Sequence, residues 1–286
     1  MSELDILEVR LGERSYPIYI GDGLLQRAGE WLAPVLGGRR LFVVTDAHVQ
    51  AAGHADALDA GLAAAGLAGE RLVLPPGEAI KSFRWLEQLL DAVIARGAER
   101  RSTLIALGGG VIGDLTGFAA AILLRGVDYV QVPTTLLAQV DSAVGGKTGI
   151  DTPRGKNLVG AFHQPRAVLV DTNTLATLPL RQRRAGYAEV VKYGCILDAA
   201  FLNWLERKGE AVIAGDTEAC RFAIRRSLTI KAEVAAADER DTADLRALLN
   251  FGHTFAHAFE HCAGYSERLL HGEAVAIGMV CAAELS

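Results

Sequence analysis

The chain has 286 residues, half of them hydrophobic, and a formal net charge of −5 at pH 7. This length exceeds what one hydrophobic core usually serves, so we expect two domains. The acidic balance, without a basic stripe, disfavours a protein that binds nucleic acid or a membrane surface. No apolar run approaches the roughly 18 residues of a membrane-spanning helix, and the acidic start does not resemble a signal peptide. We therefore expect a globular protein of the cytoplasm.

The cysteines indicate the redox compartment of the protein, and the lysines point to candidate functional residues. The four cysteines, at positions 195, 220, 262 and 281, form no Cys-x-x-Cys pair, which fits reduced thiols in a cytosol better than a disulfide framework. Only six of the 29 basic residues are lysines. Unlike arginine, a partly buried lysine can lose its proton. Five of the six lie in the motif-like stretches described below: Lys81, Lys147, Lys156, Lys192 and Lys231.

The first 177 residues alternate short apolar runs with helical patterns, which is typical of a parallel sheet covered by helices. Expected strands cover about 7–11, 16–20, 41–45, 72–74, 103–107, 127–132 and 167–171. An Ala-rich helix is expected over about 49–67, a second could be capped by Ser82, and a third ends near 124. The turn around Gly77 that precedes Ser82 could also be a plain Pro-Gly turn.

A glycine-rich turn follows the strand at 103–107. Gly108, Gly110 and Gly113 satisfy G-x-G-x-x-G between a strand and a helix, where backbone amides can hold a pyrophosphate. Alone this signal is weak, because the usual fingerprint lies on the first strand of the fold. Asp46, which ends an earlier strand, is the better candidate to bind a ribose hydroxyl. Thr134 and Thr135 follow another strand and could face a ligand or cap a helix.

The segment from Asp141 to Asn157 is rich in glycine and carries Lys147 and Lys156, with little apolar periodicity. The run ending in Gly-Lys-Thr is not a P-loop, because that motif requires glycine where this chain has Asp141. We expect a flexible loop that binds an anionic polyhydroxylated ligand; a solvated charged loop is the alternative.

After residue 177 the pattern becomes wholly helical, and we place the domain boundary there. Helices are expected over about 182–196, 199–214, 217–237, 245–262 and from 272 onward. His253, His257 and His261 recur every four residues and would share a helix face, and His271 opens the next segment. Two such imidazoles could bind one divalent ion with a carboxylate, for which Glu189 is the best candidate.

Two alternatives to this metal site stay open from the residues alone. The histidines could be scattered on a helix for solubility. Glu189 and Lys192, three residues apart on one helix face, could form only a surface ion pair.

In a series of ordered motifs the chain resembles the 3-dehydroquinate synthases over essentially its whole length. They are PGEAIKS at 76–82, GGGVIGDLTGF at 108–118, QVPTTLLAQVDS at 131–142, GGKT at 145–148, GKN at 155–157, AEVVKYG at 188–194, KAEV at 231–234, LLNFGHT at 248–254 and LHGEAV at 270–275.

The resemblance implies an α/β, Rossmann-like NAD-binding domain over 1–177, followed by an all-α metal-binding domain over 178–286 with the active site between them. It implies Zn²⁺ or Co²⁺ bound by Glu189, His253 and His271. The residues that it assigns to NAD are Asp46, Gly77, Glu78, Lys81, Gly109, Gly110, Val111, Ile112, Gly113, Asp114, Thr134, Thr135, Lys147, Lys156, Thr174, Leu175 and Thr177.

The substrate of the family is a sugar-acid phosphate, 3-deoxy-D-arabino-heptulosonate 7-phosphate. The resemblance implies transient oxidation by NAD, loss of phosphate by β-elimination, re-reduction, ring opening and aldol closure, the second step of the shikimate pathway. It assigns Lys231, Arg246 and Asn250 to the carboxylate and ring hydroxyls, and Lys147, Asn157 and His257 to the phosphate. Asp141 and Lys192 would bind hydroxyls, Lys156 would lie between nucleotide and substrate, and Arg125 would reach the phosphate from the second subunit of a homodimer.

Two departures from the family pattern are visible. The loop from Asp241 to Asp244 is one residue longer than expected, beside the carboxylate site. The family also continues beyond position 286 with further helices and a late phosphate-binding lysine, so we expect a chain shortened at its C-terminus.

Three other functions are considered. A related cyclase acting on sedoheptulose 7-phosphate or glucose 6-phosphate would share the cofactor, metal and fold, but those substrates lack the carboxylate that Lys231 and Arg246 would bind. A metal-dependent polyol dehydrogenase would release NADH. A catalytically silent nucleotide-binding paralogue would lack metal after purification.

Overall fold

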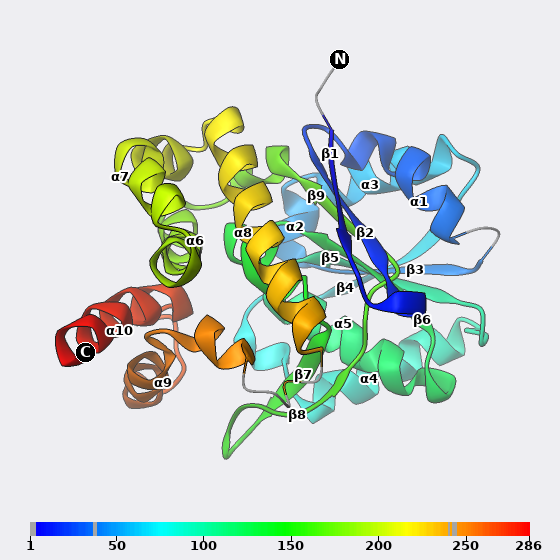
Figure 1. The fold of residues 1–286 in the computed structure, drawn as a ribbon. Helices are drawn as coiled ribbons and strands as arrows, with labels where there is room; N and C mark the ends of the chain where they lie inside the picture. The colour runs from blue at the N-terminus through cyan, green and yellow to red at the C-terminus, as the bar shows by residue number, and fades with distance from the viewer. Residues whose placement is uncertain (1–3, 37–38, 240, 242–244) are drawn as a thin grey trace.

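We analysed a computed structural model of the protein, which describes residues 4–36, 39–239, 241 and 245–286. An α/β part occupies the N-terminal side of the chain and a group of helices the C-terminal side (Figure 1). This order confirms the fold class predicted from the sequence.

A seven-stranded sheet forms the centre of the α/β part. Its strands are β1 (Asp5–Val9), β2 (Tyr16–Gly21), β3 (Leu41–Asp46), β4 (Gly69–Leu74), β5 (Thr103–Gly108), β6 (Asp128–Pro133) and β9 (Val168–Asp171). Their order is β1-β2-β9-β6-β5-β3-β4. Every neighbouring pair is parallel except β1 with β2. The residues of β5 and β9 are all buried, as expected for strands covered on both faces.

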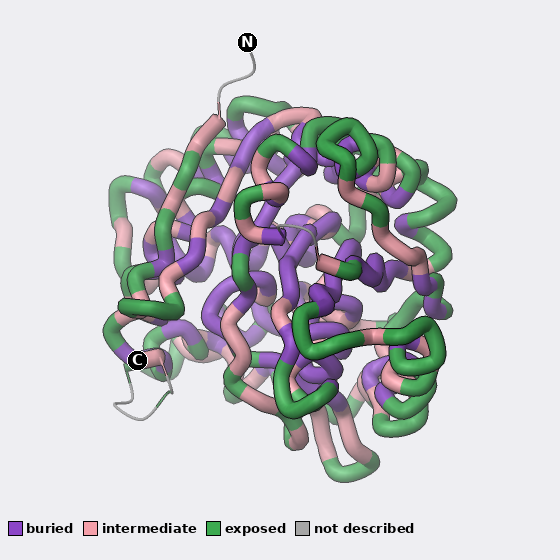
Figure 2. Tube along the Cα trace, turned by 90° about the vertical axis from the view of Figure 1, so that its right-hand side faces the viewer, coloured by how far each residue is buried: buried purple, intermediate pink, exposed green. Residues whose placement is uncertain are grey.

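Helices cover both faces of this sheet. Alternate residues of one strand point to opposite faces, so Val43 packs in a core with α1 (Ala28–Leu36) and α3 (His54–Ala63). Its neighbour Val44 packs in a second core with α4 (Phe83–Ala95) and α5 (Gly110–Ile122). Figure 2 shows the buried segments inside a shell of exposed ones. The apolar runs are therefore strands sandwiched between helices.

The predicted helix over 49–67 was wrong in detail. The chain forms α2 (Ala47–Ala51) and then α3, because Gly53 adopts the left-handed conformation, with φ of 81°, between them. Ser82 does occupy the N-cap position of α4, but its side chain makes no capping hydrogen bond.

The glycine-rich segment after Asp141 is not the flexible loop that we predicted. It forms an antiparallel hairpin of β7 (Lys147–Thr152) and β8 (Gly155–Phe162). Glycines hid this pairing from the sequence pattern, and the structure shows why they occur: a Cβ on Gly160 would lie 2.0 Å from the Thr148 carbonyl oxygen. The hairpin therefore holds its lysines on a regular scaffold.

The C-terminal part consists of α6 (Leu180–Leu197), α7 (Ala199–Ala214), α8 (Thr217–Ala237), the 3-10 helix η7 (Leu245–Asn250), α9 (His253–Cys262) and α10 (His271–Leu285). The predicted single helix over 245–262 was wrong, because Gly252 adopts a positive φ of 79° and separates η7 from α9. A hydrophobic core joins the sheet residues Ile18 and Val170 to Val190, Leu205 and Leu228 of the first three helices. Among the described residues, no helix is long and apolar enough to span a membrane.

Candidate active site

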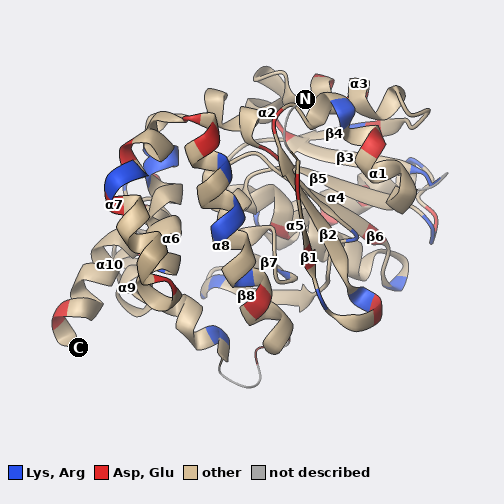
Figure 3. Ribbon diagram, turned by 45° about the horizontal axis from the view of Figure 1, so that its top comes forward, with Lys and Arg blue, Asp and Glu red and all other residues tan. Residues whose placement is uncertain are grey.

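A cavity of about 590 Å³ opens where the hairpin, α8, η7 and the starts of α9 and α10 meet. The structure brings most of the predicted substrate residues to this cavity. Those that line it are Asp141, Lys147, Asn157, Lys192, Lys231, Arg246, Asn250 and His257, together with Asp114, His253 and His271. Lys147 on β7 and Lys231 on α8 are two of its cations. Figure 3 shows that other basic residues lie along α8 as well. A cavity with several cations suits an anionic ligand.

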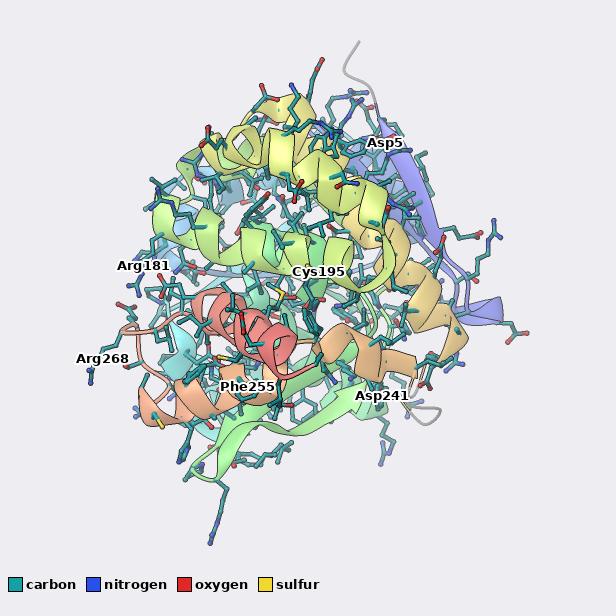
Figure 4. The ribbon with its side chains drawn as sticks, turned by 60° about the vertical axis from the view of Figure 1, so that its left-hand side comes forward. Asp5, Arg181, Cys195, Asp241, Phe255 and Arg268 are labelled. Atoms are coloured by element: carbon teal, nitrogen blue, oxygen red, sulfur yellow. The ribbon has the colours of Figure 1, made fainter. Side chains whose placement is uncertain are left out.

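Three helices converge on one group of potential metal ligands. Glu189 lies on α6, and His253 and His271 are the first residues of α9 and α10. The Nε2 atoms of His253 and His271 lie 3.6 and 3.5 Å from Glu189 Oε1. The three potential ligand atoms are all within 4.8 Å of one another. Figure 4 shows α10 packed between α6 and α9, which is why these three side chains meet.

This group fits a bound divalent cation. Glu189 is fully buried, and neither of its carboxylate oxygens has a hydrogen-bond partner of good geometry in the structure. A buried carboxylate without such partners is costly. Two imidazoles and one carboxylate are the donor set of many catalytic zinc sites. The alternative that the histidines are scattered on the surface for solubility fits His261, which is exposed. It does not fit His253, whose side chain is 12% exposed and lines the cavity.

The alternative of a surface ion pair between Glu189 and Lys192 was wrong, because both side chains are buried and in contact beneath the cavity. Burial opposes the charged forms of both groups. The attraction of Asp141 and Glu189 nevertheless raises the pKa of Lys192, and the Lys192 charge lowers the pKa of Glu189. The carboxylate therefore stays ionised, as a metal ligand must be.

Protonation of His271 opposes metal binding. Burial would lower its pKa, but the nearby carboxylates of Glu189 and Glu260 raise it to about 9 in the metal-free protein. His253 behaves differently, since burial, which outweighs the attraction of Glu189, lowers its pKa. A metal ion binding here would displace a proton from His271.

Asp141 lies in a short π-helical segment, η5 (Ala138–Ser142), at the floor of the cavity. Lys231 donates to its Oδ1 at 2.5 Å and the Tyr193 hydroxyl donates to the same atom at 2.7 Å. Burial would raise the pKa of Asp141, but the charges of Lys231 and Lys192 and these hydrogen bonds lower it well below its usual range. Asp141 is therefore a fixed acceptor of hydrogen bonds.

A second cation lies close to Lys231. The Arg246 guanidinium is buried and donates to the carbonyl oxygens of Gly145, at 2.9 Å, and Glu239, at 3.1 Å. Burial lowers the pKa of Lys231, and the positive charges of Lys192 and Arg246 lower it further. The negative charge of Asp141 opposes this shift only in part. The two cations lie together in the cavity wall. Lys147, at the cavity edge, contacts Asp241 at 2.5 Å; the rest of the longer loop, residues 242–244, lies outside the described residues.

The predicted nucleotide residues lie at one edge of the sheet. The carboxyl ends of β3, β4, β5, β6 and β9 lead into Asp46, the turn at Gly77, the Gly109–Asp114 turn, Thr134 and the 3-10 helix η6 (Thr172–Thr177). After β3 the chain adds β4 on one side of it and β5 on the other, so the strand order reverses between β3 and β5 although these strands are parallel. Ligands bind at such a switch point in open α/β sheets. Gly109 precedes α5 without a side-chain cap, so amides at the start of that helix face this edge.

Two charge pairs, the first of them largely buried, join this edge to the cavity. Lys81 contacts Asp114 at 2.6 Å and donates to Asn157 Oδ1 at 2.5 Å. Lys156 contacts Glu78, in the 3-10 helix η3 (Glu78–Ile80), at 3.2 Å. The structure therefore connects the predicted nucleotide and substrate residues through two lysines.

Several predicted residues have other contacts in this structure. Asp46 Oδ1 accepts from the amides of His48 and Val49 and caps α2. Thr174 Oγ1 accepts from Gln139, and Thr177 Oγ1 lies 2.7 Å from His54 Nε2. Arg125 is exposed at the end of the 3-10 helix η4 (Leu123–Arg125), and it is not among the described residues that line the cavity.

Sequence reasoning missed Tyr193, which binds Asp141, and Glu260, which contacts His271 Nδ1 at 3.2 Å. A signal for Glu260 was present. It lies three residues after His257 and seven after His253, so all three share one face of α9.

Comparisons with known proteins agree with this geometry. The family described as 3-dehydroquinate synthase N-terminal matches residues 71–185, and the one described as 3-dehydroquinate synthase C-terminal matches residues 186–286. The 3-dehydroquinate synthase of Rhodospirillum rubrum is 64% identical over 98% of this chain and 72% of its own length. That of Caulobacter vibrioides is 57% identical over 97% of this chain and 75% of its own length.

Solved structures are similar as well. A 2-epi-5-epi-valiolone synthase from Streptomyces hygroscopicus, with NAD⁺ and Zn²⁺ bound, has a TM-score of 0.84 and 34% identity, covering 92% of this chain and 72% of that one. A 2-deoxy-scyllo-inosose synthase has a TM-score of 0.87 and 28% identity, covering 96% and 77%. A glycerol dehydrogenase from Schizosaccharomyces pombe, with 18% identity and a TM-score of 0.72 over 92% of this chain and 69% of its own, shares the fold. The chain belongs to the 3-dehydroquinate synthase family.

Proposed function

We propose that the protein converts 3-deoxy-D-arabino-heptulosonate 7-phosphate to 3-dehydroquinate and phosphate, as a phosphate-eliminating lyase that depends on NAD and a divalent metal. The observation that carries this proposal is the single cavity in which Lys231 and Arg246 lie with His253 and His271. Two cations for a carboxylate beside a metal centre match a sugar acid better than a neutral sugar. The relatives named 3-dehydroquinate synthase support the same reaction.

Glu189, His253 and His271 would hold the metal. We propose Zn²⁺ or Co²⁺, the ions that are bound together with NAD⁺ in two similar cyclase structures. When bound, the ion would supply a Lewis acid that makes a substrate hydroxyl more acidic. Lys192 keeps Glu189 ionised for this task. The buried position of the carboxylate limits its motion, so the two imidazoles and Glu189 are preorganised for one ion.

The residues along the carboxyl edge of the sheet, from Asp46 to Thr177, would bind NAD. When bound, NAD would supply a hydride acceptor that is regenerated within each turnover. In this assignment the amides at the start of α5 bind the pyrophosphate. Lys81 and Lys156, each held by acidic or amide partners, would position the nicotinamide half beside the substrate.

Within the cavity the chain's own side chains would orient the substrate. Arg246 and Lys231 would bind its carboxylate, with Asn250 beside them on η7. Lys147, Asn157 and His257 would bind its phosphate, and Asp141 and Lys192 its hydroxyls. Because Asp141 is held ionised, it would accept hydrogen bonds from hydroxyl groups and fix the ring. Fixing the ring between two anion sites holds the phosphate in one orientation for elimination.

The wider assignments belong to the same proposal. We assign residues 1–177 to the nucleotide-binding domain and 178–286 to the metal- and substrate-binding domain. The protein would act in the cytoplasm as a homodimer, in which Arg125 of one subunit reaches the phosphate bound to the other. The exposed position of Arg125 is compatible with such a contact.

The test is phosphate release from 3-deoxy-D-arabino-heptulosonate 7-phosphate with NAD and Zn²⁺, before and after chelation, with absorbance at the NADH wavelength recorded. We expect metal-dependent phosphate release without accumulation of NADH. Sedoheptulose 7-phosphate, which lacks the carboxylate, serves as the matched substrate control. Faster release from the control would identify a different cyclase, and accumulating NADH would identify a dehydrogenase.

A further inference from the structure

Glu260 is a buried carboxylate that lies between the proposed metal ligand His271 and the β7–β8 hairpin. Its side chain is 2% exposed, on the second half of α9. Oε2 lies 3.2 Å from Nδ1 of His271, and Oε1 lies 3.1 Å from Nζ of Lys156. A buried carboxylate needs such partners. Each oxygen therefore has one, and the two partners come from different parts of the fold.

The contact with His271 leaves only one of its ring nitrogens for a metal ion. Nδ1 faces Glu260, and Nε2 faces Glu189 Oε1 at 3.5 Å. A neutral imidazole carries its proton on one nitrogen. An ionised carboxylate beside Nδ1 favours the tautomer with the proton there, so the Nε2 lone pair points to the metal centre. The same hydrogen bond restricts rotation of the ring.

The contact with Lys156 joins this carboxylate to the nucleotide edge. Lys156 lies on β8, and its Nζ also contacts Glu78 in η3 at 3.2 Å and lies 5.4 Å from the ring centroid of Tyr265. Glu260 is thus connected through one ammonium to the turn that we assign to NAD. Glu260 therefore contacts the proposed metal ligand His271 directly, and it is linked through Lys156 to Glu78, which we assign to NAD.

We propose that Glu260 is a positioning residue: it fixes the tautomer and orientation of His271, and Lys156 holds it in place from the hairpin. This inference rests on the proposed metal centre and deepens it. An ion pair with a purely structural role would stabilise the packing of α9 against the hairpin and leave the affinity of the folded protein for metal unchanged. The two roles therefore differ in an observable other than stability.

The experiment compares the parent protein with Glu260→Ala, Glu260→Gln and the control Glu206→Gln, which makes the same charge change at an exposed position on α7. Zn²⁺ affinity is measured with the metal alone by competition with a chromophoric chelator. The visible absorption spectrum of the Co²⁺-loaded protein reports ligand geometry. Circular dichroism and NAD binding verify that each variant is folded.

We expect about a 10- to 100-fold loss of Zn²⁺ affinity in Glu260→Ala, the usual effect of removing the partner of a metal-bound histidine. Glu260→Gln should lose less, because its amide oxygen can still accept from Nδ1–H. The Co²⁺ spectrum should change in Glu260→Ala, and the Glu206→Gln control should match the parent in both measurements.

The proposal is overturned if folded Glu260→Ala and Glu260→Gln bind Zn²⁺ within about twofold of the parent with unchanged Co²⁺ spectra. If Glu260→Ala does not fold, Glu260→Leu, which removes the acceptor but keeps a side chain of similar size, decides by the same two measurements. Absence of Zn²⁺ binding by the parent itself would overturn this inference and the proposed metal dependence together. A parent that binds Zn²⁺ but releases no phosphate, with weakened binding in the variants, would support the role of Glu260 and contradict the proposed substrate.

Discussion

Lys231 on α8 donates through one ammonium group to both the Oδ1 atom, at 2.5 Å, and the backbone carbonyl, at 2.6 Å, of Asp141. These residues are 90 positions apart in the sequence. The pair ties the helical part of the molecule to η5 at the point where the cavity forms. Because Lys231 is buried and Asp141 is largely buried, and Lys192 and Arg246 lie nearby, the charge of each depends on the other.

Replacement of Asp141 by Asn should lower the free energy of unfolding and change how this free energy depends on pH. The folded-state pKa of Asp141 lies below its unfolded value, so its contribution is present above about pH 4 and is lost as the pH falls below that. At neutral pH we expect Asp141→Asn to cost about 3 kcal/mol, because two buried ammonium groups lose an anion. Between pH 5 and 3, the free energy of unfolding should fall less steeply in the variant, by up to about 1 kcal/mol per pH unit.

Urea unfolding at several pH values measures this effect. Asp91→Asn, at an exposed position on α4, is the matched control. Equal slopes for Asp141→Asn and the parent protein would show that Asp141 is not held ionised in the folded state.

Removing one ligand of the metal centre should abolish metal-dependent activity while leaving the nucleotide site intact. In His253→Ala we expect Zn²⁺ affinity to fall more than about 100-fold, because the remaining imidazole and carboxylate form an incomplete site. His261→Ala removes an exposed histidine from the same helix and should behave like the parent. Isothermal titration with Zn²⁺, followed by titration with NAD, makes the comparison; unchanged Zn²⁺ affinity in His253→Ala would exclude the assigned ligand set.

Substitutions of Lys81 and Asp114 should have non-additive effects on the free energy of unfolding. Lys81 is 5% exposed and its Nζ lies 2.6 Å from Asp114 Oδ2, so Lys81→Met leaves a largely buried carboxylate without its main cation. We expect a loss of about 3 to 5 kcal/mol in the free energy of unfolding. Adding Asp114→Asn should recover part of this loss, because the unpaired charge is removed. A double-mutant cycle by urea unfolding measures the coupling, and additive effects would contradict a direct ion pair.

Gly272 follows the proposed metal ligand His271 at the start of α10. A Cβ at this position would lie 1.8 Å from the backbone carbonyl oxygen of Ala185 on α6, so Gly272→Ala must separate the two helices. We expect a loss of at least about 2 kcal/mol in stability and weaker Zn²⁺ binding, since His271 moves away from Glu189. The control is Ala276→Ser at an exposed position of the same helix. Parent-like Zn²⁺ affinity in Gly272→Ala would mean that this contact does not position the ligand.

Local patterns in the sequence determined the fold class, the order of most elements and a group of histidines with Glu189 as candidate metal ligands, from which the family resemblance selected His253 and His271. The strand at 103–107 and the glycines after it are recognisable because apolar runs and turn residues act over a few positions. The four-residue spacing of the histidines likewise fixes their common face on α9. The assignment of individual residues to NAD and substrate came from the family resemblance and remains a prediction.

Only the tertiary structure decided what depends on distant packing. Glu189 and His253 are 64 positions apart, and only the packing of α10 between α6 and α9 brings them within 3.6 Å. The β7–β8 hairpin stayed hidden because its glycines weaken the alternation that marks a strand, and its pairing is a property of two segments together. Glu260 carried a helical spacing signal, but its contacts with Lys156 and His271 depend on the position of the hairpin relative to two helices. Short-range sequence patterns specify individual helices and strands. Which side chains are buried, and which charged groups come together, is decided only when those helices and strands pack.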